Sequence, residues 1–356
     1  MLGMDVSTPP DRLILDEAAP FLDGPGVVVV IDDVDGALVL GAAAAGAHEI
    51  RVHQDLITGE RSLASHAAAA GVTYRSMPLG PELLDGARVV LLRLPRSLDR
   101  LAEVSSLVAT HAAPEVTLVA GGRIKHMTTA MNDVLRTVFD RVDVSLARQK
   151  SRVLIASGTR RADAAGALSG WPRTERHDDL GLTVAAHGGV FAGTRIDIGT
   201  RFLLGQLGSA PPSGTVVDLA CGSGVIGTWL ALRDPGLRVT ATDRSAVAVA
   251  SARATAEINK VADRITVTRA DGLELLADSS ESRIVLNPPF HNDATVSTEI
   301  ARGLFADAGR VLAPDGELWC VWNSHLRYRP ILERVVGPTR QLARNRKFTV
   351  TASVRR

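Results

Sequence analysis

A run of four residues, Asn287, Pro288, Pro289 and Phe290, has groups that could act on an amino nitrogen. The exocyclic amine of a nucleobase is a poor nucleophile because its lone pair is delocalised into the ring. The side-chain oxygen of Asn287 and the carbonyl oxygen of Pro288 could accept its two N–H groups and leave the lone pair available. The prolines stiffen the turn, and Phe290 offers a flat face to a base. The run predicts a catalytic loop that acts by orienting its substrates.

A glycine-rich turn precedes this loop in the chain. Gly222, Gly224 and Gly227 have the spacing G-x-G-x-x-G, after an expected strand at 215–220 and before a helical run at 228–233. Glycines let a ligand approach the backbone closely, and the N-terminus of a helix offers unpaired N–H groups. The pattern predicts a nucleotide-type cofactor site that would suit a dinucleotide or S-adenosylmethionine.

Three acidic residues stand at expected strand ends beside this turn. Asp243 follows the strand expected at 237–242 and could accept both hydroxyls of a ribose. Asp218, within the first strand, could orient the glycine loop and face the amino group of a methionine moiety. Asp271, after the strand expected at 264–270, could face the amino group of an adenine. Together these acids favour S-adenosylmethionine as the cofactor.

The elements that position these residues alternate between apolar β-rich runs and Ala-rich helical stretches. This alternation predicts an α/β fold in which helices cover both faces of a largely parallel sheet. Part of the pattern occurs twice, because 146–157 and 342–353 share their first three and last two residues, and 89–95 is similar to 283–289 at nearly the same offset. We therefore predict a duplicated domain.

We expect a first domain over 1–157, a linker over 158–186 and a second domain over 187–356. In the first domain, residues 32–36 (Asp-Asp-Val-Asp-Gly) replace the glycine loop, and 93–96 (Arg-Leu-Pro-Arg) replace the catalytic loop. The extra carboxylates would repel the carboxylate of a cofactor. The first domain is thus expected to bind no cofactor and to support folding or dock RNA.

The second domain resembles a known family, the ribosomal RNA (guanine-N2)-methyltransferases, which include small-subunit methyltransferase C and large-subunit methyltransferase G. Residues 218–227 (DLACGSGVIG) are similar to the first motif of the family, and 287–291 (NPPFH) to its catalytic loop. Residues 197–202 (DIGTRF) are similar to a segment that lies over the cofactor. The resemblance covers 187–356.

This resemblance implies two tandem Rossmann-like class I methyltransferase domains, of which the N-terminal one is degenerate. It also implies methylation of the N2 nitrogen of a guanine in ribosomal RNA, with the RNA or a ribosomal subunit as partner. It places catalysis at 287–290 and base contacts at Phe290 and His291. The residues that it assigns to S-adenosylmethionine are Asp218, Ala220, Gly222, Gly224, Asp243, Asp271, Gly199 and Thr200.

Composition limits the partners. The net charge of the 356 residues is only +1, so an attraction to nucleic acid must be local. The last thirty positions offer such a region, since Glu333 is their only acid against nine basic residues, Arg327, Arg329, Arg334, Arg340, Arg344, Arg346, Lys347, Arg355 and Arg356.

Targeting and metal signals are absent from the sequence pattern. Two cysteines, Cys221 and Cys320, exclude a disulfide framework and a cysteine-cluster zinc site. We read no signal peptide, and aspartates interrupt the apolar stretch at 27–47, so a cytoplasmic protein without a membrane partner is expected.

Other activities stay open at this stage. The same loop chemistry suits the N6 nitrogen of adenine in RNA or DNA, and also the side-chain amide of a protein glutamine. A nicotinamide-dependent dehydrogenase would use the glycine turn but would leave residues 287–290 without a role. An inactive RNA-binding protein would have no reason to keep the acids and the loop together.

Overall fold

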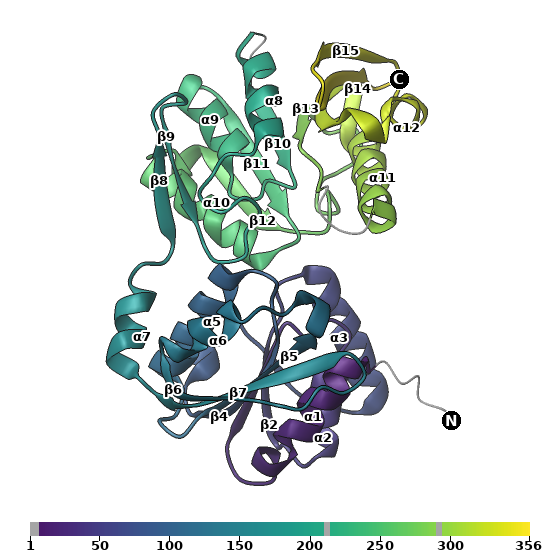
Figure 1. Ribbon diagram of the computed structural model, residues 1–356. Coiled ribbons are helices and arrows are strands. Elements are labelled where there is room, and N and C mark those ends of the chain that lie inside the picture. The colour runs from purple at the N-terminus through teal and green to yellow at the C-terminus, as the bar shows by residue number, and fades with distance from the viewer. Residues whose placement is uncertain (1–6, 210–213, 290–293) are drawn as a thin grey trace. The chain divides into compact units, whose positions relative to one another are not determined.

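A computed structural model describes residues 7–209, 214–289 and 294–356. The chain divides into two compact units, Met1–Trp171 and Pro172–Arg356. Each unit contains a sheet of seven strands, shown with its helices in Figure 1. No helix of the described residues is long and apolar enough to cross a membrane.

The N-terminal unit has the strand order β3-β2-β1-β4-β5-β7-β6, in which β7 is antiparallel to its neighbours. Its strands are β1 (Val27–Ile31), β2 (Glu49–His53), β3 (Arg75–Ser76), β4 (Ala87–Arg93), β5 (Thr117–Arg123), β6 (Phe139–Val144) and β7 (Ser151–Thr159). Its helices are α1 (Pro9–Leu22), α2 (Ala37–Ala44), α3 (Ile57–Ala70), α4 (Pro81–Leu84), α5 (Leu98–His111), η1 (Ile124–His126), α6 (Ala130–Arg136) and α7 (Arg161–Leu168).

The C-terminal unit repeats this order as β12-β11-β10-β13-β14-β16-β15, and a separate hairpin pairs β8 with β9. Its strands are β8 (Arg173–His177), β9 (Leu182–Ala186), β10 (Thr215–Leu219), β11 (Arg238–Asp243), β12 (Ile265–Arg269), β13 (Glu281–Leu286), β14 (Leu312–Asn323), β15 (Thr339–Arg344) and β16 (Phe348–Val354). Its helices are α8 (Ile198–Ser209), α9 (Val225–Arg233), α10 (Ala246–Ile258), η2 (Ala262–Arg264), α11 (Ala294–Val311), η3 (Ser324–Leu326) and α12 (Arg329–Val335).

The identical strand orders agree with the predicted duplication. The two similar apolar segments fall on β4 and β13, which lie at the same position of their sheets, and the second pair of segments ends in β7 and β16. The predicted α/β class with two tandem Rossmann-like domains is therefore confirmed.

Both faces of the central strands of each sheet are buried, as their continuous apolar runs predict. In β10, Val216 packs with Trp229 of α9 in one core, whereas its neighbour Val217 packs with Phe305 of α11 in another. Successive side chains of a strand point to opposite faces, so one strand contributes to both cores.

The stretch at 158–186, expected as a linker, has regular structure. It contains α7 and the β8–β9 hairpin, and the boundary between the units falls after Trp171. Leu182 and Val184 of β9 are buried in the core of the C-terminal unit, and Ala185 exchanges hydrogen bonds with Thr255 of α10. The hairpin therefore belongs to the C-terminal unit because its apolar side chains complete that core.

Candidate functional site

The parallel strands bring most of the predicted site residues to one edge of the C-terminal sheet. Strands β12, β11, β10 and β13 run parallel, so their carboxyl ends meet at this edge. Asp218 and Asp243 lie on β10 and β11, whereas Asp271 and Asn287 follow β12 and β13. This edge of a doubly wound sheet is where such folds bind their ligands.

The turn after β10 has the backbone conformation that its glycines predict. Ala220, Gly222 and Gly224 have φ values of 56°, 55° and 73°. A Cβ atom on Gly224 would lie 2.9 Å from the Cβ of Ala252, so this glycine permits close packing on α10. A Cβ on Gly222 would meet nothing within 4 Å among the described residues, so this glycine borders open space. The two glycines thus serve packing and ligand approach separately.

Asp218 is a buried acid with one satisfied oxygen. Its side chain is 1% exposed, and its Oδ2 accepts a hydrogen bond of 2.8 Å from the backbone N–H of Gly227. Its buried Oδ1 has no hydrogen-bond partner in the part of the chain that the structure describes. Burial raises the pKa of Asp218 to about 7, against the opposing effect of the Gly227 hydrogen bond. A cation next to Oδ1 would favour the deprotonated, charged form of Asp218.

Asp243 connects the glycine turn to the next helix. Its two oxygens accept the N–H groups of Gly222 at 3.0 Å and of Ser245 at 2.9 Å. Ser245 in turn caps α10 by accepting the N–H of Ala248 at 3.2 Å. A carboxylate oxygen has more than one lone pair, so this geometry still permits hydrogen bonds from a ribose.

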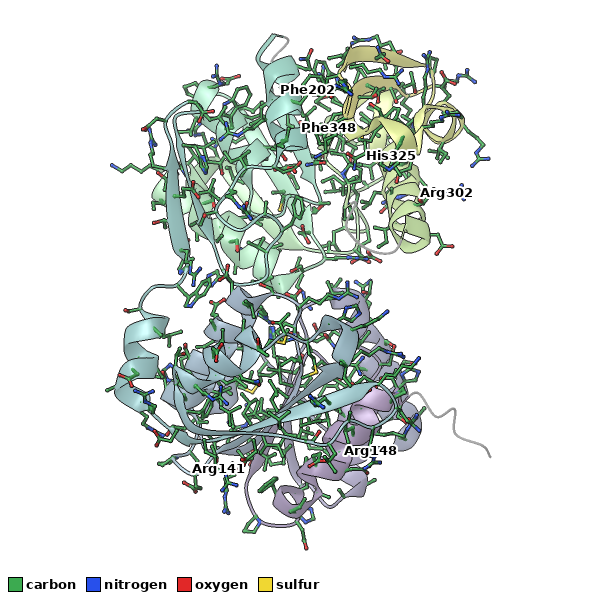
Figure 2. The ribbon with its side chains drawn as sticks, viewed as in Figure 1. Arg141, Arg148, Phe202, Arg302, His325 and Phe348 are labelled. Carbon is green, nitrogen blue, oxygen red and sulfur yellow. The ribbon has the colours of Figure 1, made fainter. Side chains whose placement is uncertain are left out.

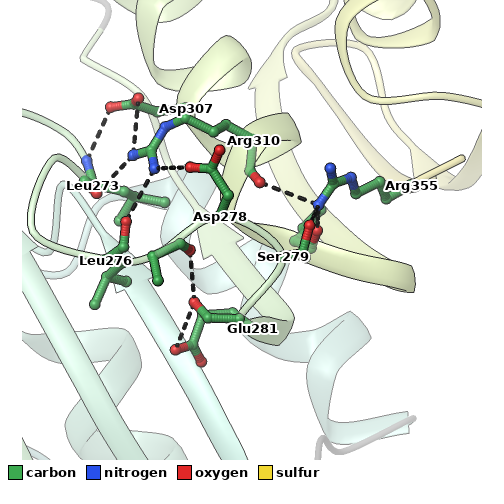
Figure 3. A network of polar contacts seen from close by, with 11 residues as sticks. Leu273, Leu276, Asp278, Ser279, Glu281, Asp307, Arg310 and Arg355 are labelled. Carbon is green, nitrogen blue, oxygen red and sulfur yellow. Dashed lines mark hydrogen bonds and ion pairs between the residues drawn. The ribbon is translucent and has the colours of Figure 1, made fainter.

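Asp271 lies on a turn that α11 holds in place. Its side chain is exposed, and Gly272 beside it has a φ of 61°. Asp307 of α11 accepts the N–H of Leu273 at 3.0 Å, and Arg310 donates to the carbonyl of the same Leu273 at 2.8 Å (Figure 3). Neither positioning residue could be predicted from the sequence, because a salt bridge on a helix surface has no motif signature.

Asn287 is held by a residue from a distant segment. Its Nδ2 donates a hydrogen bond of 2.9 Å to the hydroxyl of Thr200, which is 8% exposed. The Oδ1 of Asn287 is buried and has no hydrogen-bond partner among the residues described. Because the donor end of the amide is engaged, the acceptor end is left for another donor.

The segment at 197–202 starts α8 beside this loop. The Oδ2 of Asp197 accepts the N–H groups of Gly199 at 2.8 Å and Thr200 at 3.3 Å, which caps the helix. Phe348 of β16 packs against Gly199, since a Cβ there would lie 3.0 Å from the ring. Figure 2 labels Phe348 and Phe202, which come from neighbouring elements. Gly199 and Thr200, expected at the cofactor, thus lie next to Asn287.

The rest of the catalytic loop is described only in part. Pro288 is buried and Pro289 is exposed. Phe290 and His291, predicted to contact the base, lie outside the described residues. The thiol of Cys221 offers no nucleophile, because burial, with Asp243 and Asp218 nearby, raises its pKa well above the ordinary value. Among the described residues no group of three or more His, Cys, Asp or Glu could hold a metal ion.

The equivalent loops of the N-terminal unit are closed by its own side chains. Arg100 pairs with Asp32 at 3.5 Å, and Gln54 donates to the carbonyl of Asp33, whose carboxylate accepts the N–H of Val39 at 2.9 Å. Burial raises the pKa of Asp33 to about 6. The absence of a cofactor from this unit stays a prediction. It is supported by these contacts of Asp32 and Asp33 with side chains and backbone of the same unit.

Arg93 stands in the N-terminal unit where Asn287 stands in the C-terminal one. It forms an ion pair with Asp11 of α1 and donates to the hydroxyl of Thr8 at 3.0 Å. The position therefore serves packing of the first helix in this unit.

Two family models match the chain. The Methyltransferase small domain covers residues 181–352, and the RLMG N-terminal domain covers residues 9–160. The two matches fall within the two structural units.

Curated relatives match over nearly the whole length. The chain is 36% identical to the ribosomal RNA large subunit methyltransferase G of Streptomyces coelicolor, over 93% of this chain and 88% of the relative. It is 33% identical to the protein of the same name from Pseudomonas aeruginosa, over 91% and 86% of the two chains. A solved 16S rRNA N2 methyltransferase of T. thermophilus, in complex with AdoMet and guanosine, has the same fold, with a TM-score of 0.75, 20% identity and coverage of 99% and 93%.

Proposed function

The chain belongs to the ribosomal RNA large subunit methyltransferase G family, and from this premise we propose that it methylates the N2 nitrogen of a guanine in large-subunit ribosomal RNA. S-adenosylmethionine is the methyl donor. The acceptor is free RNA or an assembling ribosomal subunit, and the reaction takes place in the cytoplasm. The N-terminal unit acts without a cofactor of its own.

The residues at the sheet edge fit S-adenosylmethionine. The Oδ1 of Asp218, which has no partner in the described part of the chain, is suited to the ammonium group of its methionine moiety, and Asp243 to the hydroxyls of its ribose. Gly222 leaves room for close approach to the backbone, and Asp271 stands at the next strand end. When bound, the donor supplies an electrophilic methyl carbon on a sulfonium.

The Oδ1 of Asn287, an acceptor without a partner among the described residues, is the observation that carries the proposed acceptor chemistry. Thr200 accepts from Nδ2 and so leaves the Oδ1 of the amide for the substrate. This Oδ1, with the carbonyl of Pro288, would accept the N–H groups of the guanine amine. The lone pair of N2 then forms the new N–C bond as the C–S bond of the sulfonium breaks.

This mechanism needs no strong base. The methylated nitrogen is cationic and loses a proton readily to water, so orientation supplies most of the rate. Thr200 is accordingly a positioning residue that acts through Asn287.

Mapping of base methylation tests this proposal in cells. Ribosomal RNA would be compared between cells with the gene, without it, and with an Asn287→Ala copy. We expect one N2-methylguanine of the large-subunit RNA to vanish without the gene and to stay absent with the variant. An unchanged methylation pattern, or loss of an N6-methyladenine in its place, would overturn the proposed acceptor.

A further inference from the structure

The basic C-terminal segment separates into paired and unpaired cations. Arg329 binds Glu333 at 2.8 Å, and Arg340 binds Glu317 at 2.9 Å. Arg355 donates to the hydroxyl of Ser279 at 2.7 Å and to backbone carbonyls. These side chains stabilise the unit and offer little charge to a partner.

The turn between β15 and β16 carries positive charges that no acidic side chain among the described residues neutralises. Arg344, Arg346 and Lys347 are exposed, and none of them has an acidic partner among the described residues. Arg327, after η3, is likewise exposed and without an ion pair there. We call Arg327, Arg344, Arg346 and Lys347 the basic rim.

Hydrogen bonds hold the turn of the basic rim. Asn345 accepts the N–H groups of Lys347 at 2.8 Å and Phe348 at 2.7 Å, and its own N–H donates to the carbonyl of Phe348. The carbonyl of Lys347 accepts the N–H of Ser324, which ties the turn to η3. The cations therefore stand on a preformed scaffold, so their backbone loses little freedom when an anion binds.

Topology places the basic rim at the same edge as Asn287. Strand β16 is antiparallel to β14, so its first residues lie at the carboxyl edge of the parallel strands. Leu286 pairs with Cys320, which pairs with Thr351. By this register Asn287 is level with Val350 of β16, and Lys347 lies three residues beyond Val350 in the direction of the carboxyl edge. Two strand spacings and three residues of rise separate the backbones of Asn287 and Lys347 by roughly 14 Å.

Packing connects the turn to the catalytic loop. Phe348 packs against Gly199, and Thr200, which follows Gly199, accepts a hydrogen bond from Asn287. The Nζ of Lys347 lies 5.3 Å from the ring centroid of Phe348. His325, labelled in Figure 2, is exposed on the η3 segment to which the turn is tied. The cations thus flank the loop that would hold the target base.

We propose that the basic rim binds the phosphates of the RNA strand that flanks the target guanine. The proposal rests on the proposed function, because it assigns the RNA contact of the same site. Charge complementarity supports it, since the four cations of the basic rim have no acidic partner among the described residues, in a chain whose net charge is only +1.

Binding of in-vitro-transcribed, protein-free large-subunit RNA by the purified full chain tests this inference. The rim variant is Arg344→Gln with Arg346→Gln and Lys347→Gln. The control variant is Arg141→Gln with Arg160→Gln and Arg176→Gln, which removes three exposed arginines that are paired to aspartates. Both variants lose three positive charges.

We expect the rim variant to lower RNA affinity about tenfold or more and to reduce the slope of log affinity against log salt by about 2. The control variant should retain the wild-type slope, and S-adenosylmethionine affinity should be unchanged in both. An unchanged slope in the rim variant, or an equal loss in the control, would overturn the inference. Because binding is measured without the methyl donor, this result stays separate from a failure to methylate guanine.

Discussion

Replacing Thr200 with valine tests the proposed orientation of Asn287. Valine has nearly the shape of threonine but cannot accept the 2.9 Å hydrogen bond from Nδ2. The amide then loses the hydrogen bond that anchors it, and an amide that turns would present N–H groups to the N–H groups of the guanine. Misorientation of this kind costs about 10-fold to 100-fold in rate, which corresponds to about 1.4 to 2.7 kcal/mol.

The stability cost should be smaller. Leaving a partly buried donor unpaired costs about 1 kcal/mol, which lowers the Tm by about 2 to 4 °C in a unit of this size. Thr200→Ser keeps the hydroxyl and is the matched control.

The assay is steady-state methyl transfer to large-subunit RNA at saturating RNA and donor. We expect a 10-fold to 100-fold lower kcat for Thr200→Val, a KM for the donor within about twofold of wild type, and a near-normal kcat for Thr200→Ser. A fully active valine variant, or a serine variant as slow as the valine one, would refute the reasoning.

Further predictions concern the cofactor pocket. Because burial raises the pKa of Asp218 to about 7 and an ammonium group prefers the carboxylate, donor affinity should fall up to tenfold as the pH drops from 7 to 6, as titration calorimetry would record. The Asp218→Asn variant should bind the donor weakly at both pH values. A wild-type affinity that is the same at pH 7 and pH 6 would contradict this role of Asp218. Gly224→Ala should unfold more easily by about 2 kcal/mol, since its Cβ meets Ala252, whereas Gly222→Ala should lose about 1 kcal/mol of stability through its positive φ alone and should also lose donor affinity. Thermal melts would measure stability, and calorimetry would measure donor affinity. A larger stability loss in Gly222→Ala, with a larger affinity loss in Gly224→Ala, would contradict these separate roles of the two glycines.

Local patterns were sufficient to predict the fold class and the loop positions. The strand expected at 215–220 is β10, and the glycine turn and Asn287 stand at the ends of β10 and β13. Apolar runs, glycine spacing and prolines are local features, so they predict strands and turns without knowledge of the tertiary structure.

Contacts between distant segments could not be predicted in this way. The Thr200–Asn287 bond joins residues 87 positions apart, and the expected linker proved to hold a hairpin that completes a core. The basic segment was predicted as a whole, but the pairing of Arg340 with Glu317 depends on which strands are neighbours. These features are products of packing, which sequence periodicity does not encode.

Identification of the methylated nucleoside tests the central claim most directly. Large-subunit RNA from cells that lack the gene would be incubated with the purified chain and S-adenosylmethionine bearing an isotopically labelled methyl group, then digested to nucleosides for mass spectrometry. The account predicts label in N2-methylguanosine, absent with Asn287→Ala. Label in N6-methyladenosine, or in no nucleoside at all, would contradict it.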